Sequence, residues 1–296
     1  MTFPLQPGSH IFTTPSNLQL SYTVCGNGPL LIIQTPGWGI GPAYLTAGLA
    51  PLQFYFTLLY FNPRGTPPSS RPLSTEMGSN HMSTDLESLR LHLSVQKLTI
   101  LAHSNGGSIA LHYASSHPTN VSKLLLVSHR LIGYNTTPEL QTFLESRKGD
   151  PVYDTAVSRL KNMTATTDED FRDELFEVLP WYFHDYKENY FDFLATLSTG
   201  PTPQAVWARN MQKPCDENPE AELVDKLGSV TAEVFIIVGR EDAVCTVGNA
   251  ERTRELLLDG ERGNKAELFV IEECGHFPWV EKREVFFEKA LGFLRG

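Results

Sequence analysis

The sequence has few cysteines, no long apolar run and no excess of basic residues. Its four cysteines stand far apart, without the CxxC or Cys/His spacing of a zinc site or the density of a disulfide framework. The longest apolar run, FYFTLLYF, is much shorter than the roughly 20 residues that span a bilayer. We therefore expect reduced thiols, no metal or other cofactor, and no membrane partner.

Targeting signals and positive charge are scarce as well. The opening residues, MTFPLQPGSH, contain no basic segment followed by an apolar one, so we expect no secretory signal and a cytoplasmic location. The net charge of −10 disfavours nucleic acid as a partner. Residues 134–227 contain 18 acidic and 9 basic side chains, which places nearly all of the excess negative charge in the middle of the chain.

Strands and helices alternate before and after that middle segment. A hairpin is expected over residues 9–24. Continuous apolar runs, typical of strands buried on both faces of a parallel sheet, occur at 30–34, 54–61, 97–102, 121–128, 233–238 and 266–271. Helices are expected over 79–93, about 106–116, about 247–258 and from about 281 onwards. This order predicts an α/β fold with a mostly parallel, doubly wound sheet.

The alternation is lost in the middle of the chain, where acidic and aromatic residues predict several helices. We therefore expect a core interrupted by an inserted helical cap. The first part of the core would be residues 1–131, the cap 132–228, and the second part of the core 229–296.

A serine stands where the pattern changes most sharply. The stretch LTILAHSNGGSIALHYA, residues 98–114, passes from an apolar strand through small residues into a helix, with Ser104 at the turn. Small residues around a serine between a strand and a helix are typical of a nucleophile elbow, a tight turn that projects the hydroxyl above the edge of the sheet. The alternative is that Ser104 only caps the helix and the glycines serve the turn.

Two later loops offer the partners that a nucleophilic serine needs. A base must take the hydroxyl proton, and an acid must orient that base. Strand 233–238 is followed by GREDAVC, which contains Asp242, and strand 266–271 is followed by EECGHFPWVE, which contains His276. Both loops belong at the same sheet edge as Ser104, so we predict a Ser104–His276–Asp242 triad, with Glu241 as the close substitute for Asp242.

An oxyanion hole is expected beside the serine. One donor would be the backbone N–H of Asn105, and the other would come from the loop after strand 30–34, which begins Thr-Pro-Gly-Trp-Gly. Pro36 has no N–H, so the second donor is predicted to be Gly37 or Trp38. The alternative is that this loop is an ordinary turn.

These motifs resemble those of the α/β-hydrolase superfamily, and more narrowly the prolyl aminopeptidase (proline iminopeptidase) group. The resemblance covers nearly the whole chain. LLIIQTPGWGIGPAYL is similar to the group's HGGPG loop, FNPRGTPPSSRP to its DQRGxGxS stretch and AHSNGG to its GHSxGG elbow, while GREDAV and CGHFPW are similar to its acid and histidine loops. The resemblance implies that the helical insertion roofs the active site.

The chain departs from that group at three places. Thr35-Pro36 stands where the group has His-Gly, and the elbow begins with Ala102 in place of glycine. Trp207 is followed by Ala208, where the group has a glutamate that helps to bind the free α-amino group of the substrate. A buried ammonium needs a carboxylate partner. The acidic residues considered as replacements are Asp185, Glu188 and Asp192.

The leading functional hypothesis is therefore a serine hydrolase that forms an acyl-enzyme. A serine nucleophile argues against dehalogenase and epoxide hydrolase chemistry, which the same fold performs with an aspartate. The missing glutamate favours a small, fairly hydrophobic ester, thioester or lactone. Hydrolysis or cyclisation of an acyl chain in specialised metabolism, with an acyl-carrier domain as partner, fits this description. Residues expected to face the substrate, each with packing as its alternative role, are Trp181, Tyr182, His184, Tyr186 and Trp207.

Two other functions stay open on the sequence. A proline iminopeptidase would cleave prolyl-amide chromogens only when the amine is free. A non-hydrolytic cyclase or binding protein would keep the fold without using the triad, and its Ser104 would resist labelling by a fluorophosphonate.

Overall fold

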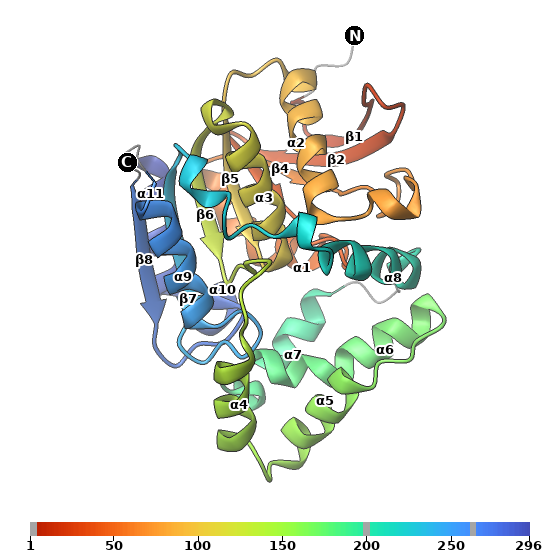
Figure 1. The fold of residues 1–296 in the computed structure, drawn as a ribbon, viewed down its shortest axis with the longest axis vertical. Coiled ribbons are helices and arrows are strands. Elements are labelled where there is room, and N and C mark those ends of the chain that lie inside the picture. The colour runs from red at the N-terminus through yellow and green to blue at the C-terminus, as the bar shows by residue number, and fades with distance from the viewer. Residues whose placement is uncertain (1–4, 198–201, 261–264) are drawn as a thin grey trace.

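The computed structural model describes residues 5–197, 202–260 and 265–296. Its centre is an eight-stranded sheet in the order β1-β2-β4-β3-β5-β6-β7-β8 (Figure 1). The predicted hairpin is formed by β1 (Gly8–Thr13) and β2 (Gln19–Gly26), and β2 also pairs antiparallel with β4 (Thr57–Phe61). The other neighbouring strands are all parallel, which confirms the predicted fold class.

The central strands are buried on both faces. They are β4, β3 (Leu30–Gln34), β5 (Leu98–His103), β6 (Val121–Val127) and β7 (Glu233–Gly239), whereas β8 (Ala266–Ile271) is an edge strand and only partly buried. Successive side chains of a strand point to opposite faces, and accordingly Ile32 packs in one core cluster while Leu31 and Ile33 pack in the other. This arrangement explains why the strands read as continuous apolar runs.

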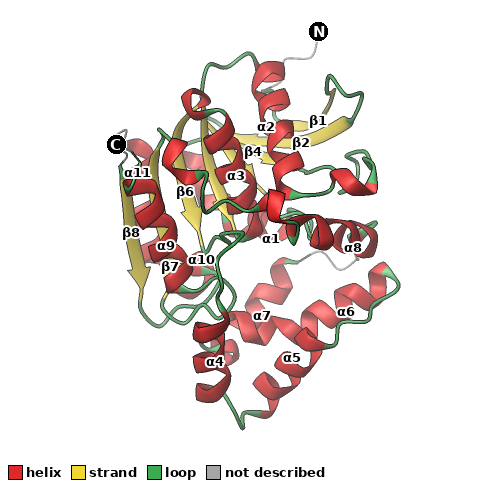
Figure 2. Ribbon diagram, in the orientation of Figure 1, coloured by secondary structure: helices red, strands yellow, loops and turns green. Residues whose placement is uncertain are grey.

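Helices cover each face of the sheet (Figure 2). One cluster contains side chains of α2 (Ser79–Leu93), α3 (Asn105–Ser116) and α9 (Val247–Leu258). The opposite cluster contains side chains of α1 (Ala43–Gly48) and of the last helices, α10 (Pro278–Glu281) and α11 (Arg283–Arg295).

The described residues in the middle of the chain form five α-helices: α4 (Thr137–Ser146), α5 (Pro151–Lys161), α6 (Asp168–Val178), α7 (Tyr186–Thr196) and α8 (Ala205–Asp216). The first four, which we call the cap helices, lie beyond the carboxyl ends of the parallel strands, while α8 returns towards α2 (Figure 1). No strand of the sheet lies among the described residues between 132 and 228. The boundaries proposed for the cap stay predictions.

One predicted element differs in its limits. The apolar run 54–61 is only partly strand, because residues 50–54 form a 3-10 helix and Phe54 is exposed. The final helix, expected from about residue 281, corresponds to α11, and the short α10 precedes it. In the part of the chain that the structure describes, no helix is long and apolar enough to cross a membrane. All four cysteines are free.

Candidate active site

Ser104 occupies the turn between β5 and α3 in a strained backbone conformation. Its φ is 55° and its ψ is −131°, and a non-glycine residue with positive φ costs about 1–3 kcal/mol unless its surroundings enforce it. The Ser104 carbonyl accepts hydrogen bonds from the backbone N–H groups of Gly107 and Arg130, each at 3.0 Å. Ser104 stands at the N-cap position, but its side chain makes no capping hydrogen bond. The structure therefore does not support the alternative that the hydroxyl serves as a helix cap.

His276 and Asp242 are joined by a buried hydrogen bond. His276 Nδ1 donates to Asp242 Oδ2 over 2.9 Å, and both side chains are at most 1% exposed. Asp242 Oδ1 also accepts from the backbone N–H groups of Val244 and Cys245, at 2.9 and 2.8 Å. The carboxylate is thus fully occupied in holding its own loop and the imidazole, which leaves His276 Nε2 as the ring nitrogen free to face a substrate.

Glu241, the residue considered as a substitute for Asp242, has another role. Its Oε2 accepts from Cys274 N at 2.9 Å and lies 3.7 Å from His184 Nδ1. The neighbouring Glu281 accepts from the backbone N–H groups of Gly275 and His184. Burial raises the pKa of the Glu281 carboxyl to about 7. These two glutamates shape the loop before His276 and do not contact its imidazole.

The side chain of His103 is hydrogen-bonded to the backbone of His276. His103 Nε2 donates to the His276 carbonyl over 3.0 Å, and Tyr44 donates its hydroxyl hydrogen to His103 Nδ1 over 2.9 Å. Burial lowers the pKa of His103 well below its usual value, in keeping with a neutral ring that donates at one nitrogen and accepts at the other. Sequence analysis did not single out this contact.

A cavity of about 120 Å³ brings Ser104 and His276 together. No hydrogen bond joins Ser104 to His276 in the described part of the chain. In many hydrolases such bonds tighten only in the substrate complex. The rest of the lining, apart from His103, is apolar or aromatic: Pro36, Ile40, Tyr44, Leu175, Phe176, Leu179, Tyr182, Phe193, Leu197 and Phe277.

Only one of the five residues expected to face the substrate lines this cavity. Tyr182 does so, and its ring meets that of His276 edge-on at 5.2 Å. Trp181 is buried against Ala156 and Ala243 instead, and His184 lies with its side chain 38% exposed beside Glu241. The remaining two contact other parts of the protein, Tyr186 at Tyr153 and Trp207 at Arg71.

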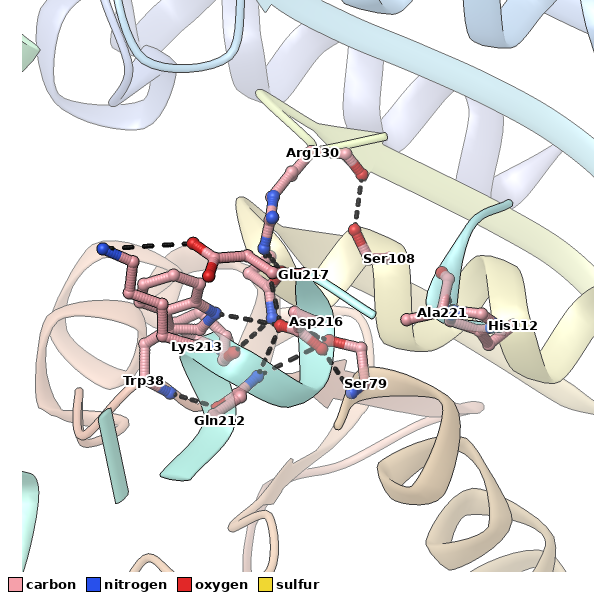
Figure 3. Close-up of polar contacts among 12 residues, drawn as sticks. Trp38, Ser79, Ser108, His112, Arg130, Gln212, Lys213, Asp216, Glu217 and Ala221 are labelled. Carbon is pink, nitrogen blue, oxygen red and sulfur yellow. Dashed lines mark hydrogen bonds and ion pairs between the residues drawn. The ribbon is translucent and has the colours of Figure 1, made fainter. Parts of the chain in front are cut away.

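The oxyanion loop is held by a buried polar network (Figure 3). Trp38 N donates to Gln212 Oε1 over 2.6 Å, so this amide already has a partner. Gly37 has a φ of 72°, and a side chain there would lie 2.5 Å from Gln212 Oε1. Asn105, which follows the serine, donates its side-chain amide to the Pro36 carbonyl over 3.0 Å. The structure thus brings Asn105 beside the predicted loop and leaves Gly37 as the candidate for the second donor.

Sequence analysis missed five residues of the cavity wall that come from the middle of the chain: Leu175 and Phe176 of α6, Phe193 of α7, and Leu179 and Leu197, which directly follow these helices. The helical spacing of α6 indicates an apolar face but does not reveal what that face covers. Among the described residues, no group of three or more His, Cys, Asp or Glu side chains is arranged to hold a metal ion.

Comparison with known proteins agrees with this fold. A family model described as the alpha/beta hydrolase fold matches residues 34–282. The chain belongs to the α/β-hydrolase fold family. Among curated relatives, this α/β hydrolase is 24% identical over 291 residues to a proline iminopeptidase from Pestalotiopsis fici, covering 96% of this chain and 98% of the relative. It is also 23% identical to a 2-hydroxy-6-oxononadienedioate/2-hydroxy-6-oxononatrienedioate hydrolase from Pseudomonas putida, covering 94% and 92%.

Solved structures of other proteins superpose on this α/β hydrolase over nearly its whole length. The esterase RhEst1 from Rhodococcus superposes with a TM-score of 0.70 at 17% identity, covering 98% of this chain and 99% of that one. An enol-lactonase from Burkholderia xenovorans superposes with a TM-score of 0.63 at 16% identity, covering 97% and 100%. At these identities the likeness establishes the fold alone.

Proposed function

We propose that this chain is a serine hydrolase that transfers a small, neutral, apolar acyl group from an ester, thioester or lactone to water. The observation that supports it is the shared cavity of Ser104 and His276, in which the imidazole is oriented by Asp242 and the other walls are almost entirely apolar. A dry apolar cavity of about 150 Å³ accommodates benzene. A cavity of about 120 Å³ therefore suits an acyl group of about four to six carbon atoms.

The mechanism follows from the three side chains. Ser104 Oγ attacks the carbonyl carbon while His276 Nε2 takes the hydroxyl proton, and Asp242 stabilises the resulting imidazolium. The tetrahedral intermediate collapses as its bond to oxygen or sulfur breaks, and His276 returns the proton to the leaving group. Water then attacks the acyl-Ser104 carbonyl, with His276 again as base. The backbone N–H groups of Asn105 and Gly37 stabilise the oxyanion in both steps.

A panel of substrates tests this function. Wild-type protein should hydrolyse p-nitrophenyl butyrate and the butyryl thioester of N-acetylcysteamine, a mimic of a carrier-bound acyl chain, and intact mass should show acyl-Ser104. Ser104→Ala should reduce kcat by at least about 10³-fold. Ser115→Ala, on the same helix with its hydroxyl bonded to the His112 carbonyl, is the matched control and should retain activity. Turnover that survives in Ser104→Ala would refute the proposal, as would an absence of any Ser104 adduct with a fluorophosphonate.

Proline iminopeptidase activity is the second candidate, because the similarity to such an enzyme spans nearly the whole chain. The described residues that line the cavity include no carboxylate to bind a free amine. Ala208 packs in the core, and the carboxylate of an adjoining cavity, Asp168, accepts the amide hydrogens of Gln204 and Val206. We expect no cleavage of prolyl p-nitroanilide. Cleavage that requires a free amine would favour the peptidase instead.

A further inference from the structure

A buried polar network links α8 to Trp38 of the oxyanion loop, to Ser79 and to Arg130 (Figure 3). Asp216 is its centre. Ser79 N donates to Asp216 Oδ1 over 2.7 Å, while Ser79 Oγ, Gln212 Nε2 and Trp38 Nε1 donate to Oδ2 over 3.1, 3.3 and 3.3 Å. The guanidinium of Arg130 lies 3.4 Å from the same oxygen. Asp216 and Gln212 are at most 1% exposed.

Each side of the oxyanion site is bonded to this network. On the loop side, Gln212 Oε1 accepts from Trp38 N, one residue after Gly37. On the elbow side, the Asn105 side chain donates to Ser79 Oγ over 3.0 Å and accepts from Arg130 Nη1 over 3.1 Å. The Asn105 amide also reaches the Pro36 carbonyl, so the elbow and the loop are joined directly as well as through α8.

A gain in folding stability does not by itself explain why Asp216 and its partners are buried together. Burial raises the pKa of the Asp216 carboxyl, which shows that removing this charge from water is costly. The desolvation of buried ion pairs largely offsets their mutual attraction. The clear physical effect of the network is geometric, because five donors from four segments must converge on one carboxylate.

We propose that Gln212 and Asp216 are positioning residues that fix the oxyanion loop against the nucleophile elbow. The bond from Trp38 N to Gln212 joins residues 174 positions apart in the chain, so α8 supplies the anchor of the oxyanion loop. The proposal rests on the proposed function, since it assigns these residues to the stabilisation of the same oxyanion. A displaced donor loses transition-state stabilisation without affecting the apolar part of the cavity.

The test compares Gln212→Met and Asp216→Asn with Glu87→Gln. Gln212→Met keeps the length of the side chain but removes the acceptor for Trp38 N. Glu87 is the matched control, because its carboxylate likewise accepts hydrogen bonds from several donors, namely Arg90, Tyr113 and Asn120, none of which lines the cavity. With p-nitrophenyl butyrate we expect kcat to fall at least about 10-fold in the two α8 variants, with KM within about 2-fold of wild type. Glu87→Gln should change neither constant.

A pair of inhibitors separates positioning from a general structural effect. A butyl trifluoromethyl ketone adds to Ser104 and places a negative oxygen in the oxyanion site, whereas the corresponding unreactive butyramide occupies only the apolar cavity. Binding of the trifluoromethyl ketone should weaken at least about 10-fold in the α8 variants, and binding of the amide should not change. Equal weakening of both inhibitors, or unchanged kcat, would overturn the proposal.

Two further measurements cover the case in which the α8 variants do not fold and distinguish a failure of this inference from a failure of the proposed function. If the α8 variants do not fold, Trp38→Phe serves instead: it removes the indole N–H that donates to Asp216 but keeps an aromatic ring beside Arg130. It should lower kcat about 3-fold at constant KM, and an unchanged kcat would overturn the positioning role. The rate of fluorophosphonate labelling at Ser104 separates the two proposals. No labelling of wild-type protein would refute the proposed function, whereas equal labelling of wild type and Gln212→Met would refute only the inference about α8.

Discussion

At the scale of single residues, the glycines after Ser104 show how closely helix and sheet approach at the elbow. A Cβ on Gly106 would lie 2.6 Å from the Gln34 carbonyl oxygen, and one on Gly107 would lie 2.4 Å from the Cβ of His129. Both glycines are inside α3, where helix propensity alone favours alanine. The small residues of the motif therefore serve contact between backbone segments.

This contact predicts opposite effects for two helical glycines. Gly106→Ala should destabilise the protein by about 1–3 kcal/mol, because the backbone oxygen it meets cannot move without shifting β3. Gly292→Ala in α11, where a Cβ would meet nothing within 4 Å, should stabilise the protein by about 0.5–1 kcal/mol. Urea unfolding monitored by tryptophan fluorescence measures both. A neutral or stabilising Gly106→Ala would contradict the close approach at the elbow.

At the scale of elements, Arg147 at the end of α4 connects the cap helices to the acid loop. Its guanidinium donates to the carbonyls of Trp181 and Glu241 over 2.8 and 2.9 Å, and stacks within 5.3 Å of the ring centroids of Phe143, Tyr153 and Trp181. Glu241 directly precedes Asp242. One side chain from the cap thus supports the loop that orients His276.

Replacing this arginine should loosen the cap and its attachment to the core. Arg147→Met removes two charge-assisted hydrogen bonds and should lower the free energy of unfolding by about 2–4 kcal/mol. Limited proteolysis between residues 132 and 228 should become faster. Arg252→Met, which breaks an exposed pair with Glu255, is the control and should change stability by less than about 1 kcal/mol. Similar effects of the two substitutions would rule out the proposed attachment.

At the scale of the whole molecule, buried histidines make stability depend on pH. Burial lowers the pKa of His112 to about 4 and that of His129 to about 3, and it lowers that of His103 as well. The unfolded chain, with histidine pKa values of about 6.5, takes up these protons first as the pH falls. Stability is therefore lost below about pH 6.5. Glu281 acts in the opposite sense, since its folded pKa is about 7 and the folded state binds its proton first.

These four groups predict a steep acid transition. Between about pH 6 and 4.5, the three histidines less Glu281 correspond to about two protons, or roughly 3 kcal/mol of stability per pH unit from these groups alone. Since domains are stable by about 5–15 kcal/mol, we expect unfolding near pH 4–5, measured by circular dichroism. In His112→Gln the amide can still donate to the Ala221 carbonyl, as the imidazole does over 3.0 Å, but it cannot be protonated. The variant should lose about 1.4 kcal/mol per pH unit from this slope; an unaltered slope would show that His112 does not contribute.

The sequence alone was sufficient to predict the strands and the edge of the sheet at which the candidate site lies, because both follow from local patterns of apolar residues. Continuous apolar runs predicted the strands, and the position of Ser104, Asp242 and His276 directly after three of those strands placed them at one sheet edge. Parallel strands end at the same edge, so the prediction needed no knowledge of packing. The catalytic roles of these residues stay predictions until Ser104→Ala is measured.

Which cap residues lie beside Ser104 depends on how the helices pack, and the sequence pattern does not reveal it. Trp181 and His184 lie next to Tyr182 or close to it in sequence but do not line the cavity, whereas Leu175, Phe176 and Phe193 do. Likewise, nothing near Trp38 in the sequence indicates that Gln212 accepts its amide hydrogen. The apolar pattern of a strand is set by the burial of its two faces in one sheet. The face that a helix presents to the cavity depends instead on how separate helices pack. Such packing joins residues that are far apart in the chain, so local sequence does not reveal it.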